Sequence, residues 1–158
     1  MNKRLIYILD AALIIICIIT LATAVFGLPK MASMSAKAFP EVAYLRYPIL
    51  LGIYVACMPF YMGVFQTFRL IRLIKKENAF NEQACRSLRV ITMSTICVIT
   101  LFMIGTIYLN VEKALPPGLF LLGITIIFAA CVIAVFAEVL RALLMKVIDI
   151  KNENDLTI

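Results

Sequence analysis

Four long apolar runs, separated by short polar segments, dominate the sequence. They extend over about residues 5–28, 47–68, 88–109 and 118–136. A helix of about 20 residues crosses the roughly 30 Å hydrocarbon core of a bilayer, and each run has about that length. A helix also satisfies its own backbone polar groups, which lipid cannot do. The pattern therefore predicts an all-α integral membrane protein, a four-helix bundle with up-down-up-down order, built as one domain over residues 1–158.

The second and fourth runs continue past their membrane-spanning lengths in a helical pattern. Ile71 and Ile74 follow the second run, with Arg69 and Arg72 on a charged face. After the fourth run, apolar residues recur at the spacing of one helix face, at positions Leu140, Leu143, Leu144, Val147 and Ile148. We expect spans two and four to extend into the cytoplasm, with residues 69–87 as a loop and residues 137–158 as a helix and tail.

The segments between the runs carry capping and kinking signals. Asn81 precedes Glu82 and is typical of a helix N-cap. Residues 29–46 contain two prolines and predict a first outer loop, with room for a short interfacial helix over residues 31–38. Pro59 lies near the middle of the second run, where the missing N–H predicts a kink. The kink has two interpretations, shape alone or a functional hinge.

The basic residues predict which side of the membrane each segment occupies. The chain has 15 Lys and Arg residues and a formal net charge of +6. With the N-terminus inside, eleven basic residues fall in cytoplasmic segments and four outside, which the positive-inside rule favours. We predict a multi-pass protein of the cell membrane with cytoplasmic N- and C-termini. Because topology explains the positive charge, no direct binding of nucleic acid is expected.

Candidate catalytic chemistry is sparse. The chain has no histidine, and it contains no phosphate-binding, serine-hydrolase or zinc-protease motif. Of its five cysteines, four lie inside apolar runs and none forms a CxxC pair, which indicates small buried side chains. We therefore expect no enzymatic activity, no catalytic residues, no cofactor and no metal site.

Two acids, Asp10 and Glu138, fall within or at the edge of predicted spans. An ionisable side chain there is a candidate functional site, here for a proton or cation. The alternative is structural: interhelical salt bridges at the inner rim of the bundle. The candidate basic partners for such bridges are Arg69, Arg72, Arg89 and Arg141.

Several local sequences are similar to those of a known family. They are Pro59-Phe60, the loop Asn78-Ala79-Phe80-Asn81, the step Leu88-Arg89, the stretch Phe136-Ala137-Glu138-Val139, and the terminus Glu153-Asn154-Asp155-Leu156-Thr157-Ile158. The whole chain resembles the bacterial four-span membrane family catalogued as domain of unknown function 2975. At the loop, Asn81 stands where that family typically has serine. Members are often encoded beside a small helix-turn-helix regulator, so the resemblance implies a membrane protein paired with a DNA-binding protein.

The leading hypothesis is a non-enzymatic membrane regulator that binds or sequesters a small cytoplasmic helix-turn-helix transcription factor. Its expected contacts lie in the loop and the tail, at Lys75, Lys76, Phe80, Asn81, Arg86, Asp155, Leu156, Thr157 and Ile158. The loop has orientation of the protein as an alternative role, and the tail has packing on its own bundle. The second hypothesis is a small transporter-like or immunity-type membrane protein that handles a solute or peptide through Asp10, Glu138 and Pro59. A purely structural subunit is the third.

Overall fold

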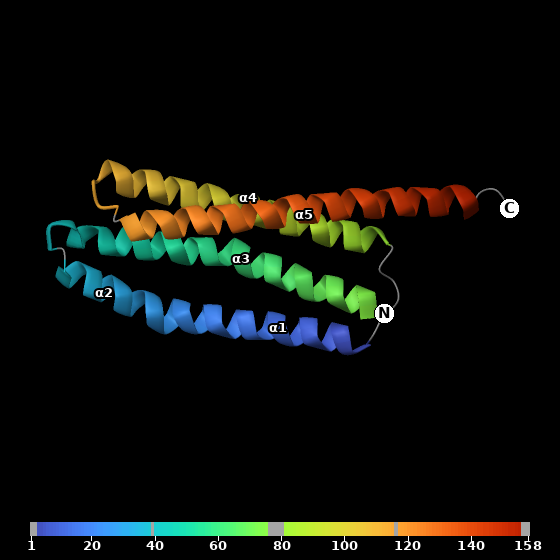
Figure 1. The fold of residues 1–158 in the computed structure, drawn as a ribbon, viewed down its shortest axis with the longest axis horizontal. Helices are drawn as coiled ribbons and strands as arrows, with labels where there is room; N and C mark the ends of the chain where they lie inside the picture. The colour runs from blue at the N-terminus through green and yellow to red at the C-terminus, as the bar shows by residue number, and fades with distance from the viewer. Residues whose placement is uncertain (1–2, 39, 76–80, 116, 156–158) are drawn as a thin grey trace.

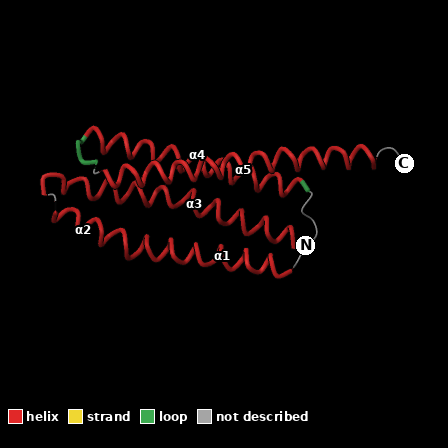
Figure 2. Tube along the Cα trace, viewed as in Figure 1, coloured by secondary structure: helices red, strands yellow, loops and turns green. Residues whose placement is uncertain are grey.

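The computed structural model describes residues 3–38, 40–75, 81–115 and 117–155, and nearly all of them are helical (Figures 1 and 2). No strand occurs among these residues. Four helical segments are long and apolar enough to cross a membrane: Ile6–Met34, Ala43–Lys75, Glu82–Val111 and Pro117–Glu153. The prediction of an all-α protein with four long apolar helices is confirmed.

The first helix is longer than its apolar run. It consists of α1 (Lys3–Ala22), a π-helical turn η1 (Thr23–Gly27) and α2 (Leu28–Ala38), which follow one another along one edge of the molecule (Figure 1). The outer loop expected from Pro29 onward is therefore helical as far as Ala38. A π turn replaces i→i+4 bonds by i→i+5 bonds, and here the Leu28 N–H bonds the Thr23 carbonyl. This widened turn lets the helix continue past Pro29, which would otherwise break it.

The remaining helices are continuous. A 3₁₀ turn, η2 (Pro40–Leu45), leads into α3 (Arg46–Lys75), which runs through Pro59 without a break. The N-cap Asn81 opens α4 (Glu82–Val111), and α5 (Pro117–Asp155) is the longest helix at 39 residues. Between α4 and α5, Lys113 adopts a left-handed backbone with φ of 53°, which reverses the chain.

The long helices run in alternating directions along the length of the molecule (Figure 1). The C-terminal part of α5 projects beyond the ends of the others (Figure 1). Among the described helices, α4 is central, because it packs along α3 on one side and α5 on the other. In contrast, α1 packs mainly against α3 and much less extensively.

Small side chains form most of the buried contacts between helices. The buried residues include Ala56, Ala84, Ala130 and Ala137, and the polar Ser87 and Ser94. Such residues let helix backbones approach closely where lipid offers no hydrophobic driving force. Large apolar side chains instead point outward, as in Phe26, which is 76% exposed, and Phe136, which is 71% exposed. Outward-facing apolar side chains on long helices are what a bilayer solvates.

Candidate functional site

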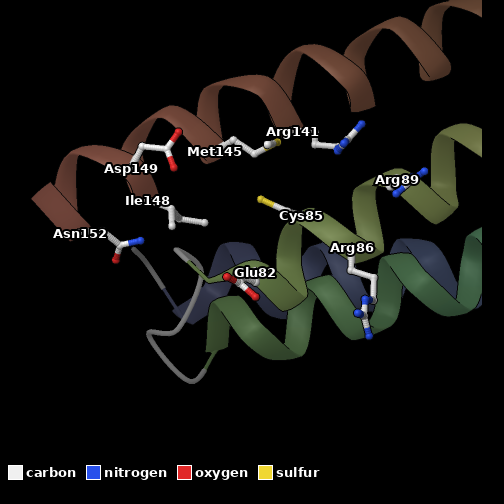
Figure 3. A pocket seen from close by; sticks show the side chains of 9 residues that line it. All are labelled: Glu82, Cys85, Arg86, Arg89, Arg141, Met145, Ile148, Asp149 and Asn152. Carbon is white, nitrogen blue, oxygen red and sulfur yellow. The ribbon is translucent and has the colours of Figure 1, made fainter.

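A cavity of about 310 Å³ lies between the start of α4 and the C-terminal part of α5 (Figure 3). It occurs where the two helices leave their close contact, which is made by Leu88, Ile91 and Ala137. Beyond that contact, longer side chains stand between the helices. The lining residues are Glu82, Cys85, Arg86, Arg89, Arg141, Met145, Ile148, Asp149 and Asn152.

Two helix faces supply these side chains. On α4, residues 82, 85, 86 and 89 follow the i, i+3, i+4, i+7 spacing of one face. On α5, residues 141, 145, 148, 149 and 152 are spaced i, i+4, i+7, i+8, i+11 and also share one face. Figure 3 shows Cys85 pointing toward α5, whereas Arg86 points away from it. The cavity is therefore a groove with an apolar floor and charged edges.

Charge of both signs surrounds this groove. Three arginines and two carboxylates line it, and Arg141 donates a hydrogen bond of 2.7 Å to Glu138 one turn earlier on α5. Within the part of the chain that the structure describes, no ion pair joins Arg86 or Arg89 to an acid. Both guanidiniums are thus available to an outside group. A surface of this kind suits a folded protein with complementary charges better than a uniformly anionic ligand.

The predicted partner-binding residues fall into three groups. Arg86 lines the groove, and Asp155 is the last residue of α5. Lys75 and Asn81 make other contacts, described below. Five of the predicted residues, two in the loop and three in the tail, lie outside the described residues: Lys76, Phe80, Leu156, Thr157 and Ile158.

Lys75 and Asn81 have structural partners. Lys75 forms an ion pair with Asp10 on α1, and its ammonium lies 5.1 Å from the centre of the Tyr7 ring. The Asn81 side chain accepts a hydrogen bond of 2.9 Å from the Ala84 N–H, which confirms the predicted cap. Asn81 therefore fixes where α4, and with it the α4 face of the groove, begins.

The two rim acids differ from each other in their pairing. Asp10 makes an interhelical bridge as predicted, but to Lys75 instead of an arginine. For Glu138 the predicted interhelical bridge is wrong, because its partner Arg141 lies three residues later on the same helix. A residue three positions away on a helix is always within reach, so no second helix is needed. The candidate partners Arg69 and Arg72 form no ion pair with any described acid.

Other candidate chemistry is limited. Across residues 3–38, 40–75, 81–115 and 117–155, no group of three or more acidic or cysteine side chains lies close enough to hold a metal. The five cysteines are free thiols. Pro59 lies inside continuous α3, and its role as a hinge stays a prediction.

Sequence reasoning missed most of the groove. Cys85, Arg89, Met145, Ile148, Asp149 and Asn152 were not expected to meet a partner. Their spacing on two helices was readable, since each set follows one helix face. Which faces oppose each other depends on how α4 and α5 are rotated, and the spacing does not give that.

Comparison with known proteins agrees with a membrane protein. The model of a family described as protein of unknown function (DUF2975) matches residues 30–158. The chain belongs to this family. A relative from Bacillus subtilis (strain 168), described as the uncharacterized membrane protein YoaS, is 41% identical over the full length of both chains. No solved structure matches the chain. Like that relative, this DUF2975 member is a membrane protein. Its own described residues include four candidate spans.

Proposed function

We propose that this protein is a non-enzymatic regulator located in the cell membrane, and that it binds a small cytoplasmic helix-turn-helix protein at the α4–α5 groove. The observation that supports this most is the groove itself. It joins Arg86, which belongs to the predicted loop 69–87 and lies on α4, to the C-terminal part of α5. Of the contacts expected in the loop and the tail, Arg86 lines the groove, and Asp155 lies three residues beyond the lining residue Asn152 on α5.

The chemistry of the groove fits a protein partner. Arg86 and Arg89 offer planar guanidiniums that bind carboxylates in pairs, whereas Asp149 offers an acceptor for a basic side chain. Met145 is 45% exposed and supplies an adaptable apolar contact. Paired opposite charges around an apolar centre give orientation and specificity. A DNA backbone would be repelled by Glu82 and Asp149.

Regulation would follow from location. A transcription factor held at the membrane is withdrawn from the chromosome, and its release restores DNA binding. Release would follow from any change that rotates α4 relative to α5, since that alters the groove.

The test uses the full-length protein in liposomes and a small helix-turn-helix protein of the kind that the family resemblance implies as its partner, and flotation measures the bound partner. Arg86→Glu with Asp149→Lys reverses charge on both edges and should weaken binding at least about tenfold, or about 1.4 kcal/mol. Deleting residues 153–158 should also weaken it. Arg4→Glu is the control for a charge reversal outside the groove, because Arg4 is exposed on α1 and does not line the groove.

Equal binding by the wild type and the groove variant would refute the proposal, as would absence of binding by the inserted wild type. Loss of binding in the Arg4 variant as well would mean a non-specific charge effect. A reporter gene under the partner's DNA site adds a cellular readout. Expression of this reporter in the groove variant should equal its expression in a strain that lacks the gene for the membrane protein.

A second function, handling of a solute or peptide, is favoured by one observation. The buried polar atoms Tyr61 Oη, Gln66 Oε1 and Ser87 Oγ have no hydrogen-bond partner within the described part of the chain. Unpaired polar atoms inside apolar helices are costly and can mark a path or a binding site. Loss of solute resistance in Glu138→Ala, with partner binding unchanged by the tail deletion, would favour this function.

A further inference from the structure

A second cavity, of about 500 Å³, opens between α1 and α3 on a different side of the fold from the α4–α5 groove. It is lined by Ile14 of α1 and by Phe65, Phe68, Arg69 and Arg72 of α3. The four α3 residues follow the spacing i, i+3, i+4, i+7 and so share one face. This α1–α3 groove exists because α1 packs loosely against α3.

One end of the α1–α3 groove carries two positive charges, on Arg69 and Arg72. Arg69 and Arg72 are exposed, and neither forms an ion pair with an acid in the described ranges. The nearby acid on α1, Asp10, is taken by Lys75. Guanidinium groups bind phosphate oxygens in a bidentate manner.

The other end is apolar and lies deeper along the helices. Phe65 is 66% exposed and Ile14 is 48% exposed, so both present open apolar surface. Arg69 directly follows the predicted span 47–68, and Arg72 lies about one turn, or roughly 5 Å, further out. The arginines therefore stand at the level of lipid headgroups, and Phe65 and Ile14 stand at the level of acyl chains.

We propose that the α1–α3 groove binds an anionic phospholipid, whose phosphate contacts Arg69 and Arg72 and whose acyl chain lies against Ile14, Phe65 and Phe68. The polarity of the groove matches that of a lipid along its length. A zwitterionic lipid would bring its own ammonium toward two arginines, so a headgroup with net negative charge is preferred. Basic sites between transmembrane helices recognise acidic headgroups in this manner.

The chain has no tryptophan, which allows a clean reporter. Phe68→Trp places the sole tryptophan in the groove, and Phe136→Trp is the matched control. Phe136 is 71% exposed on α5 and ends the fourth predicted span as Phe68 ends the second. Quenching of each tryptophan is measured in vesicles that contain brominated phosphatidylglycerol or brominated phosphatidylcholine.

The groove reporter should prefer phosphatidylglycerol at least about fivefold, because each basic residue near the surface contributes on the order of 1 kcal/mol. The control reporter should show nearly equal quenching. Arg69→Gln with Arg72→Gln should remove the preference, whereas Lys146→Gln with Lys151→Gln removes the same charge from α5 and should keep it. Raising the salt concentration should reduce the preference in the unsubstituted protein, which tests the proposal without a second variant.

Three outcomes would overturn the proposal. The first is no preference at the groove reporter, or a preference that survives loss of both arginines. The second is loss of preference on adding inorganic phosphate in excess while the ionic strength is held constant, which would identify a site for a free anion. The third is a groove reporter that neither lipid quenches, which would mean that protein, such as a second copy of the chain, covers the groove.

Discussion

The hydroxyl of Tyr54 on α3 donates a hydrogen bond of 3.1 Å to the backbone carbonyl of Ala24 in the π turn of the first helix. The Ala24 carbonyl has no donor of its own helix to accept from. The Leu28 N–H is already bonded to Thr23, and the next position in the i→i+5 series is Pro29, which has no N–H. The hydroxyl of Tyr54, 30 residues later in the chain, therefore supplies the missing donor and connects the π turn of the first helix to α3.

The first prediction concerns this bond. Tyr54→Phe should lower the free energy of unfolding by about 1 kcal/mol, in the range of interhelical hydrogen bonds within membranes. Unfolding in mixed micelles, followed by helical circular dichroism, measures it. Pro29→Ala restores an N–H near the Ala24 carbonyl, so Tyr54→Phe should cost less in that background. Equal costs in both backgrounds would contradict the role given to Pro29.

A second prediction tests the bridge between α1 and α3. Asp10→Asn should reduce stability by about 0.5–1 kcal/mol, because the pair is partly exposed and screened by solvent. The exchanged pair, Asp10→Lys with Lys75→Asp, should regain most of that loss. Glu138→Gln breaks a pair within one helix and should cost less, about 0.3 kcal/mol. A double-mutant cycle at low and high salt measures the coupling, which should shrink as salt increases.

The third prediction concerns the start of α4. Asn81→Ala removes the side-chain acceptor of the Ala84 N–H and should destabilise the protein by about 1 kcal/mol. Asn81→Ser keeps an acceptor and should remain close to the original stability. Hydrogen–deuterium exchange at the first turn of α4 should accelerate in the alanine variant alone. Similar exchange in all three proteins would show that the cap contributes little.

Orientation supplies the fourth prediction. In a variant with all five cysteines replaced by alanine, a single new cysteine reports its side of the membrane. On intact cells, a membrane-impermeant maleimide should label Lys113→Cys in the α4–α5 turn and should spare Asn152→Cys near the end of α5. Cell lysis should make both reactive. The opposite pattern would reverse the predicted topology.

The apolar pattern was enough to predict the helices, because each run is long and a helix is the natural structure for such a run in lipid. Asn81 was equally readable, since its capping depends on residues within one turn. The continuation of the first helix past Pro29 was not predictable in this way. It depends on a π turn and on Tyr54, which lies far away in the sequence.

The pairing of charges had a similar limit. The end of α3 offers several basic side chains, and Arg72 and Lys75 differ in depth by only about one turn, or roughly 5 Å. A small axial shift of α1 decides which of them Asp10 reaches. The α4–α5 groove likewise depends on helix rotation. Sequence spacing defined the faces, and packing selected which faces meet.

Helix α5 is much longer than its predicted membrane-spanning part. If residues 118–136 occupy the membrane, the remaining 19 residues of the helix, to Asp155, reach about 28 Å further. They form one uninterrupted rod, and the far part of that rod projects past the other helices (Figure 1). A slight tilt of α5 within the bilayer would thus move the far end of this helix over a much larger arc. Changes in membrane thickness or lateral pressure would reach that end of α5 as an amplified displacement.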